Sequence, residues 1–245
     1  MSLSIATLAV PAVLFLATLI RSTFGFGEAL FAVPLLALLM PVEVAAPVAA
    51  LVSITVAGIV MIEDWRKVHA GSAGRLVLST VLGIPLGLVL LKTASEGLVK
   101  AILGVVIIAF SVYFLANPGR EELRNDRLAW LFGFGAGILG GAYGMNGPPL
   151  VIYGSLRKWS PIHFRATLQG YFLPASMAVM GGYWVTGYWT VQVSRYYLYS
   201  LPVVLGAIVL GRALNRRLDG PRFLLYVHVA LVLLGAALLF QAARA

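Results

Sequence analysis

Residues 21–28 read Arg-Ser-Thr-Phe-Gly-Phe-Gly-Glu, and they interrupt apolar sequence that otherwise extends from Leu3 to Met40. A second stretch, residues 140–149, reads Gly-Gly-Ala-Tyr-Gly-Met-Asn-Gly-Pro-Pro and interrupts another apolar run in the same way. Glycine permits backbone conformations that end a helix, and proline kinks or breaks a helix because it lacks a backbone N–H. Each stretch therefore predicts a break between a long helix and a short one.

The chain around these breaks has the composition of a membrane protein. Of its 245 residues, 60% are hydrophobic and 11% are charged, and the net charge is +9. A globular domain usually has about 25% charged residues, so this chain has too little polar surface for a soluble enzyme or a nucleic-acid-binding protein. In a membrane protein, an excess of Lys and Arg is expected beside the spans on the cytoplasmic side.

Charged residues and helix breakers divide the chain into ten apolar segments. Eight of them are longer: 3–20, 44–62, 76–91, 98–116, 128–142, 166–186, 197–214 and 223–241. The other two, 29–40 and 149–156, follow the breaks. They are too short to cross a hydrocarbon core of about 30 Å, because a helix rises about 1.5 Å per residue. We therefore predict an all-α polytopic membrane protein with two short helices among longer ones.

The two breaks lie at matching positions in what looks like a duplicated chain. Gly25 precedes Gly144 by 119 residues. Each half then contains one broken helical hairpin followed by three transmembrane helices. We predict a first membrane repeat over residues 1–116, a cytoplasmic linker over 117–127 and a second membrane repeat over 128–245.

Positive charges predict how the two repeats are oriented. If each broken pair is a hairpin that enters and leaves by one face, 13 Lys and Arg residues fall on one side of the membrane and 4 on the other. If each pair is one kinked span, the split is 9 to 8. The positive-inside rule favours hairpins, and hence inverted repeats with both termini outside. The charge count is the same for re-entrant and for fully spanning hairpins, so both arrangements stay open.

Inverted repeats with broken helices are typical of secondary transporters, which build their substrate site at the breaks. In both hairpins the short helix starts at the break, so its free N–H groups and positive dipole end face the middle of the membrane. These backbone positions, which predict a site for an anion, are Gly25, Gly27, Gly144 and Gly147. The alternative is that the glycines only let helices pack closely.

Glu28 and Arg21 are charged residues at the first break. A carboxylate at mid-membrane costs about 2.5 to 3.5 kcal/mol, so Glu28 requires a partner or a proton. Glu28 is predicted either to carry a proton with the anion or to cap the short helix, where the dipole favours negative charge. Arg21 is the nearest partner for Glu28, and it is also a candidate for direct contact with the substrate.

Further polar residues are candidates for substrate binding. Neutral hydrogen-bond donors at the breaks are Ser22, Thr23, Tyr143 and Asn146. Arg165, Gln169 and Ser176 form a polar stripe on one face of the helix after the second hairpin. The alternative for Arg165 is that its side chain reaches the cytoplasmic membrane surface.

The chain offers no pattern for an enzyme. It has no cysteine, no His-x-x-x-His motif and no pair of carboxylates within a span, so we predict neither a catalytic site nor a metal or cofactor site. His228 lies inside the last span without a second ligand-type residue at i+3 or i+4. For His228 an interhelical hydrogen bond is therefore favoured over metal binding.

The residues around the breaks resemble those of a known family, the TauE/SafE sulfite exporters, also called TSUP transporters. The similarity covers nearly the whole chain and is carried by residues 22–30 with Val33-Pro-Leu35 and Pro41, by residues 140–153 and by residues 164–168. The resemblance implies a permease that moves small organic or inorganic anions, such as sulfite, sulfoacetate or related sulfonates. It also implies a multi-pass protein of the cytoplasmic membrane of a prokaryote.

Together, these patterns predict a secondary transporter for a small anion, coupled to protons through Glu28. A passive anion channel is the alternative, because helix N-termini around a pore would serve a channel too. The expected partners are the anion and the lipid bilayer, without nucleic acid. Substrate identity, direction of transport, coupling ion and assembly as a homo-oligomer stay open at this point.

Overall fold

The computed structural model describes residues 5–64, 70–116, 127–215 and 220–244. Within these ranges the chain forms ten α-helices and no strand, which confirms the all-α prediction. Their bounds are α1 Ile5–Phe24, α2 Glu28–Ala37, α3 Val42–Asp64, α4 Ala70–Thr93, α5 Glu96–Ala116, α6 Leu128–Tyr143, α7 Gly147–Leu156, α8 Pro161–Val185, α9 Val191–Asn215 and α10 Gly220–Ala242.

Local sequence signals explain several of the helix ends. Ser95 precedes α5, and its side-chain oxygen accepts a hydrogen bond from the Leu98 N–H at 3.3 Å. Thr190 does the same for the Val193 N–H at the start of α9, also at 3.3 Å. Both are N-cap bonds, which satisfy a backbone donor that has no partner within the helix.

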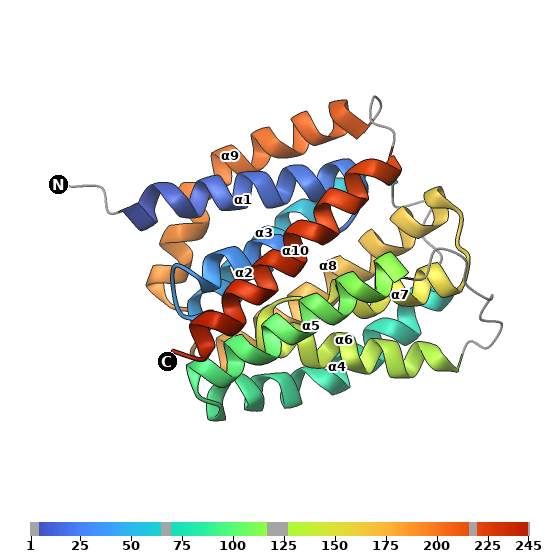
Figure 1. The fold of residues 1–245 in the computed structure, drawn as a ribbon. Coiled ribbons are helices and arrows are strands. Elements are labelled where there is room, and N and C mark those ends of the chain that lie inside the picture. Colours follow the sequence, from blue (N-terminus) through green and yellow to red (C-terminus); the bar gives the residue numbers. More distant parts are fainter. Residues whose placement is uncertain (1–4, 65–69, 117–126, 216–219, 245) are drawn as a thin grey trace.

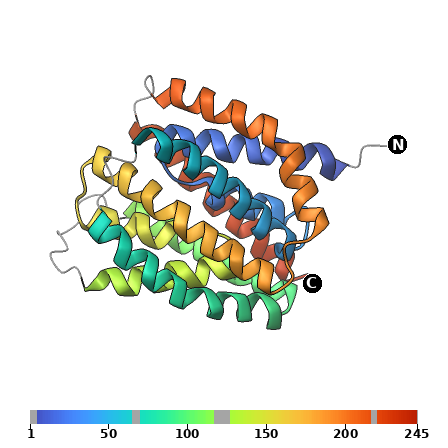
Figure 2. The same cartoon turned by 180° about the vertical axis from the view of Figure 1, so that it is seen from behind.

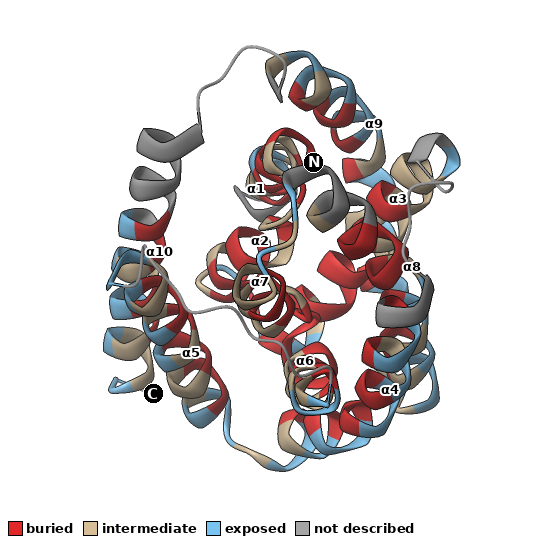
Figure 3. Cartoon of the chain, turned by 90° about the vertical axis from the view of Figure 1, so that its right-hand side faces the viewer, coloured by how far each residue is buried: buried red, intermediate tan, exposed pale blue. Residues whose placement is uncertain are grey.

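The two short helices lie at the centre of the bundle. Seen from the end of the bundle, α2 and α7 are surrounded by the longer helices (Figure 3). Helix α1 begins on the same side of the bundle as α10 ends, whereas α5 ends and α6 begins on the opposite side (Figure 1). The view from behind shows α3, α4, α8 and α9 lying across the other face (Figure 2). The breaks before α2 and α7 are therefore enclosed by the bundle.

Four helix pairs make the main contacts of the bundle: α4 with α6, α1 with α9, α5 with α10, and α3 with α8. Helices α4 and α6 approach so closely that glycine is required at several positions. A Cβ at Gly87 would lie 2.1 Å from the Ile138 carbonyl oxygen, and a Cβ at Gly137 would lie 2.1 Å from the Thr80 carbonyl oxygen. At these positions glycine serves close helix packing, as it commonly does in membranes.

The outer surface of the bundle is apolar, as expected for a protein in lipid. Exposed side chains on α4 and α9 include Leu78, Leu82, Leu86, Val89, Leu198, Val203, Leu205 and Val209. Among the described residues, four stretches are long and apolar enough to cross a membrane: Val42–Ile62, Ala73–Thr93, Glu96–Ala116 and Val191–Leu214. Shorter apolar helices include Leu8–Phe24, Glu28–Ala37, Leu128–Tyr143 and Leu231–Ala242. The protein is a membrane protein.

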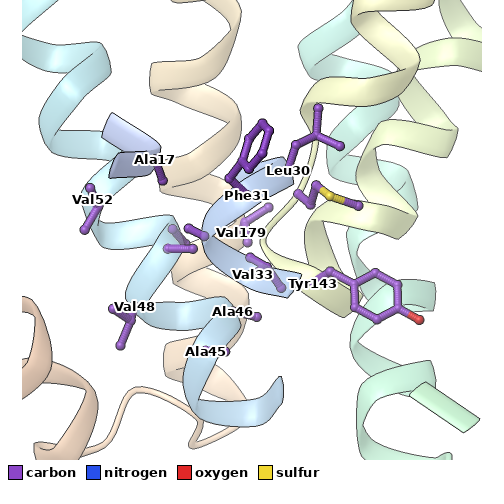
Figure 4. Close-up of a cluster of buried hydrophobic side chains, with 14 of the residues drawn as sticks. Ala17, Leu30, Phe31, Val33, Ala45, Ala46, Val48, Val52, Tyr143 and Val179 are labelled. Carbon is purple, nitrogen blue, oxygen red and sulfur yellow. The ribbon is translucent and has the colours of Figure 1, made fainter. Parts of the chain in front are cut away.

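Small side chains bring the first short helix against its neighbours. Figure 4 shows Val33 of α2 beside Ala46 of α3, and both side chains are buried. Inside a bilayer the lipid tails are as apolar as these side chains, so close van der Waals packing holds the helices together. This packing fixes the position of α2, and with it the position of the first break.

Candidate functional site

The two breaks have similar backbone geometry. Helix α1 ends where Gly25 takes a φ of 87°, and the Gly25 N–H donates to the Arg21 carbonyl at 2.6 Å. Helix α6 ends where Gly144 takes a φ of 63°, and the Gly144 N–H donates to the Gly140 carbonyl at 2.7 Å. A left-handed glycine of this kind is a common helix ending. Gly27, with a φ of 102°, then lets the chain turn into α2.

A small cavity lies between the two breaks. Its lining comes from both breaks and from the neighbouring helices α3 and α8: Arg21, Gly27, Glu28, Ala29, Leu30, Ser53, Met145, Asn146, Gly147, Pro148 and Phe172. Its volume is about 20 Å³, which is room for about one water molecule. An oxyanion with four or more heavy atoms is larger, so such an anion needs some lining group to move.

Arg21 and Glu28 form a buried ion pair at this cavity. Arg21 Nη1 lies 2.5 Å from Glu28 Oε2, and the two side chains are 3% and 1% exposed. Arg21 is in the last turn of α1 and Glu28 is in the first turn of α2. Each charge therefore lies at the helix end whose dipole favours it. Two opposite charges in contact also avoid the cost of one isolated ion in the membrane.

Three neutral side chains from α3 and α8 hold the Arg21 guanidinium in place. Arg21 Nη1 donates to Ser53 Oγ at 2.7 Å, and Arg21 Nη2 donates to Gln169 Oε1 at 3.0 Å. The guanidinium carbon lies 4.8 Å from the centre of the Phe172 ring, which is cation–π distance. Ser176 extends the network, because its hydroxyl donates to Ser53 Oγ at 3.2 Å.

Several polar atoms at the cavity have unfilled hydrogen-bond positions. Arg21 Nε and Glu28 Oε1 are buried and have no hydrogen-bond partner among the described residues. Asn146 is at the N-cap of α7, but its side chain makes no cap hydrogen bond. A buried polar atom without a partner costs free energy. The residues that line the cavity therefore offer an incoming ligand one donor on a cation and one acceptor on a carboxylate, and the Asn146 amide lies beside them.

The two short helices contribute differently to the cavity. Helix α2 begins at Glu28 and has backbone N–H groups throughout its first turn. Helix α7 begins at Gly147 and continues with Pro148 and Pro149, which have no N–H. The sequence prediction treated both helix ends as equal sources of donors. In the structure, α2 is the richer source, and α7 adds the Asn146 amide.

The predicted substrate-binding residues fall into two groups. Arg21, Gly27, Asn146 and Gly147 line the cavity together with Glu28. Gly25 and Gln169 lie just behind Arg21, where the Gln169 Nε2 donates to the Gly25 carbonyl at 2.9 Å.

The second group of predicted residues does not line the cavity. The Thr23 hydroxyl donates to the Leu19 carbonyl at 2.8 Å. Ser22 lies against Gly211 of α9, where a Cβ would come within 2.5 Å of the Ser22 Cβ. The Tyr143 hydroxyl donates to the Val99 carbonyl of α5 at 3.1 Å.

Gly144 belongs to this second group as well. It packs against α3, because a Cβ there would lie 2.5 Å from the Ala46 carbonyl oxygen. The side chain of Arg165 lies outside the described part of the structure, although its backbone is in α8. Its two interpretations therefore stay as predictions.

Six residues that line the cavity were not among the predicted site residues: Ala29, Leu30, Ser53, Met145, Pro148 and Phe172. Ser53 had a signal, since it is a polar residue in an otherwise apolar span. Met145 and Phe172 had none, because apolar residues are common in every span. Their roles depend on which helices pack beside the breaks.

His228 does not make the interhelical hydrogen bond that was predicted for it. Neither ring nitrogen has a partner among the described residues. Its ring stacks on Phe114 of α5 with 4.4 Å between the ring centres, and Phe110 lies at 5.6 Å. That prediction was wrong because the neighbouring face of α5 supplies aromatic rings at the depth of His228. In the described part of the chain, no three His, Cys, Asp or Glu residues come together as metal ligands would.

Comparison with known proteins connects this site to a family. The family model for the sulfite exporter TauE/SafE matches residues 10–238, a range that contains both breaks and the whole cavity lining. A curated relative, the probable sulfite/organosulfonate exporter TauE of Cupriavidus necator, is 28% identical over 196 residues. The aligned part covers 77% of this chain and 75% of the relative. No solved structure matches the chain significantly.

Proposed function

Because the chain belongs to the sulfite exporter TauE/SafE family, whose members are transporters and not enzymes, we propose that it moves sulfite or an organosulfonate across the cytoplasmic membrane of a prokaryote. The substrate class follows from the name of the curated relative, which is a probable sulfite/organosulfonate exporter. The single observation that carries the proposal is a buried arginine with an unfilled donor at a cavity between two helix breaks.

Arg21 is the cation that receives the anion in this proposal. Among the residues that line the cavity, Arg21 is the only one with a positive charge. A guanidinium binds an oxyanion through charge-assisted hydrogen bonds, which contribute about 1.5 to 3 kcal/mol each. The N–H groups at the start of α2 and the Asn146 amide supply further donors on the other sides of the cavity. These groups together suit a small oxyanion better than a neutral solute.

Glu28 couples the anion to a proton. With Glu28 ionised, the Arg21–Glu28 pair is neutral, so an added anion leaves one uncompensated negative charge inside the membrane. Protonation of Glu28 removes that charge and leaves Arg21 to balance the anion. A proton and a monovalent anion then occupy the site together. The unpartnered Glu28 Oε1 is the atom at which the proton can bind.

An inverted repeat would let the two sides of the membrane reach this site in turn. Exchanging the halves maps α1 onto α6, α3 onto α8, α4 onto α9 and α5 onto α10. Under this exchange, the α4–α6 contact corresponds to the α9–α1 contact, and the α3–α8 and α5–α10 contacts each correspond to themselves. All four of these helix contacts are present in the structure. Helices α1 and α6 also run in opposite directions (Figure 1). This arrangement supports residues 1–116 and 128–245 as inverted repeats, with α2 and α7 as re-entrant arms.

A carrier fits the site better than a passive channel. A channel needs a continuous wet path, whereas this cavity has room for about one water molecule and is crossed by a network of buried hydrogen bonds. Transport in proteoliposomes should therefore saturate with anion concentration and should respond to a pH gradient. Conductance above about 10⁶ ions per second would exceed the turnover of a carrier whose gating motions take microseconds to milliseconds, and it would indicate a channel.

The proposal is tested by counterflow of labelled sulfite or ethanesulfonate into proteoliposomes. Arg21→Gln should abolish counterflow, because the amide removes the only positive charge at the cavity. Lys100→Gln is the matched control, since Lys100 is also buried but pairs with Glu96 on α5 at 2.7 Å, away from the cavity. Normal counterflow by the Arg21 variant, or equal loss in both variants, would refute the proposed site.

A further inference from the structure

Gln169 joins the second half of the chain to the first break by two hydrogen bonds. It lies on α8, is 4% exposed, and is 148 residues from Arg21 in the sequence. Its Oε1 accepts from Arg21 Nη2 at 3.0 Å, while its Nε2 donates to the Gly25 carbonyl at 2.9 Å. Both ends of one amide therefore hold the same turn, one through the cation and the other through the backbone.

The arginine has one edge that an anion can take with least disturbance. A guanidinium binds an oxyanion with two parallel N–H groups, and one such fork consists of Nε and Nη2. In Arg21, Nη1 already donates hydrogen bonds to Glu28 and Ser53, whereas Nε has no hydrogen-bond partner among the described residues. The neutral Gln169 oxygen occupies Nη2. An anion that binds the Nε and Nη2 fork meets Gln169 as its direct competitor.

The cavity is too small to admit the anion unless a neighbouring group moves, and Gln169, which binds Arg21 beside the cavity, is the group that the anion can replace. Its volume of about 20 Å³ accommodates about one water molecule. Gln169 is a neutral amide, so its bond to Arg21 is weaker than the bond of a charged oxyanion to the same nitrogen. Exchange of Gln169 for the anion is therefore favourable at Arg21, and it frees the amide from one of its two partners.

We propose that Gln169 is a positioning residue that the anion displaces from Arg21, so that loading of the site releases α8 from the first break. This inference rests on the proposed function of the cavity. Once Arg21 Nη2 binds the anion, Gln169 keeps only its hydrogen bond from Nε2 to the Gly25 carbonyl at the first break. The edge contact of Phe26 with Phe164 of α8, at 6.1 Å between ring centres, then bears more of the contact between the break and α8. Release of this latch permits the two halves to move relative to each other.

The test separates affinity from turnover in the full-length protein. Dissociation constants for sulfite and ethanesulfonate would be measured in nanodiscs, and turnover in proteoliposomes would be measured with the same anions. Gln169→Leu removes the competing oxygen and the bond to Gly25. We expect its Kd to fall about tenfold while its turnover falls at least fivefold. Gln169→Glu places a charged competitor beside Arg21, so its Kd should rise at least tenfold at neutral pH.

Tyr171→Phe is the matched control on the same helix. Tyr171 is buried, its hydroxyl shares a hydrogen bond of 2.7 Å with Thr80 of α4, and it does not line the cavity. This variant should keep both Kd and turnover within about twofold of wild type. If Gln169 instead binds the substrate directly, Gln169→Leu would weaken binding. If Gln169 only supports the fold, thermal stability would fall in both Gln169→Leu and Gln169→Glu. Turnover of Gln169→Leu would then fall without tighter anion binding. Either pattern would overturn the latch.

The outcomes also distinguish the latch from the proposed function. If Arg21→Gln loses binding but Gln169→Leu does not bind more tightly, the anion site stands and the latch is wrong. If wild-type protein binds neither anion, or if Arg21→Gln binds them normally, the proposed site fails and the latch fails with it. If Gln169→Leu does not fold, the opposite shift expected for Gln169→Glu decides the question by itself, since an unchanged Kd in that variant would contradict the competition.

Discussion

Neutralising Glu28 should strengthen anion binding and abolish its dependence on pH. In the structure the Glu28 carboxylate contacts Arg21 Nη1, while the free Nε lies on the other side of the same guanidinium. For two unit charges separated by the width of a guanidinium, roughly 5 to 6 Å, the repulsion at an effective dielectric constant of about 20 is roughly 3 kcal/mol. Glu28→Gln removes this repulsion and keeps an oxygen that can accept from Arg21.

The sign of the pH effect follows from the same charges. In wild-type protein the anion binds together with a proton, so affinity should rise as pH falls and one proton should be taken up per anion. In Glu28→Gln the group no longer titrates. Its Kd should be at least tenfold lower than that of wild type at pH 7.5, which corresponds to about 1.4 kcal/mol or more, and it should stay constant as pH changes.

Ethanesulfonate is the suitable ligand for this assay, because it remains a monovalent anion throughout the useful pH range. Binding would be measured by calorimetry in nanodiscs at several pH values. Glu43→Gln serves as control, since Glu43 is an exposed acid in the first turn of α3, outside the cavity lining. In proteoliposomes, Glu28→Gln should retain exchange but lose accumulation driven by a pH gradient. A variant that binds no more tightly than wild type and keeps the same pH dependence would refute the proton role.

Three further predictions concern orientation, packing and the extent of the site. Because the chain has no cysteine, single cysteines can be introduced and labelled from either side of the membrane. A cysteine at Ser160 should react only from the cytoplasm, and a cysteine at Ser95 should react only from outside. The reverse labelling would contradict the inverted topology. Gly87→Ala should destabilise the protein by about 1 to 3 kcal/mol, because its Cβ would meet the Ile138 carbonyl oxygen at 2.1 Å. Gly135→Ala, where a Cβ has nothing within 4 Å, should not lower the melting temperature. Tyr143→Phe should cost about 1 kcal/mol of stability, because it loses the hydrogen bond to the Val99 carbonyl, and it should leave anion affinity unchanged. A large loss of anion affinity would instead show that Tyr143 contacts the substrate.

The positions of the helices could be predicted because glycine, proline and charge mark their ends. All ten apolar segments correspond to helices in the structure, including the two short ones. The pairing of Arg21 with Glu28 was predictable for a similar reason. Both lie at one break, and an intramembrane carboxylate needs a nearby partner.

The rest of the site depends on how the helices rotate and pack, which a single sequence does not reveal. Ser22 and Thr23 adjoin Arg21 in the chain, yet successive helical residues point about 100° apart, and these two face α9. Ser53 and Phe172 reach the cavity because α3 and α8 pack beside the breaks. Gln169 was identified from its spacing in a polar stripe, but only the structure gives it both Arg21 and Gly25 as partners.

The most direct test of the central claim is to locate a bound anion. Selenite has the shape and charge of sulfite and carries a heavy atom, so anomalous scattering from crystals soaked at low concentration would show its position. We predict a selenium peak between the two breaks, within contact distance of the Arg21 guanidinium, and no such peak in Arg21→Gln crystals. A peak elsewhere in the bundle that persists in the Arg21 variant would contradict the account.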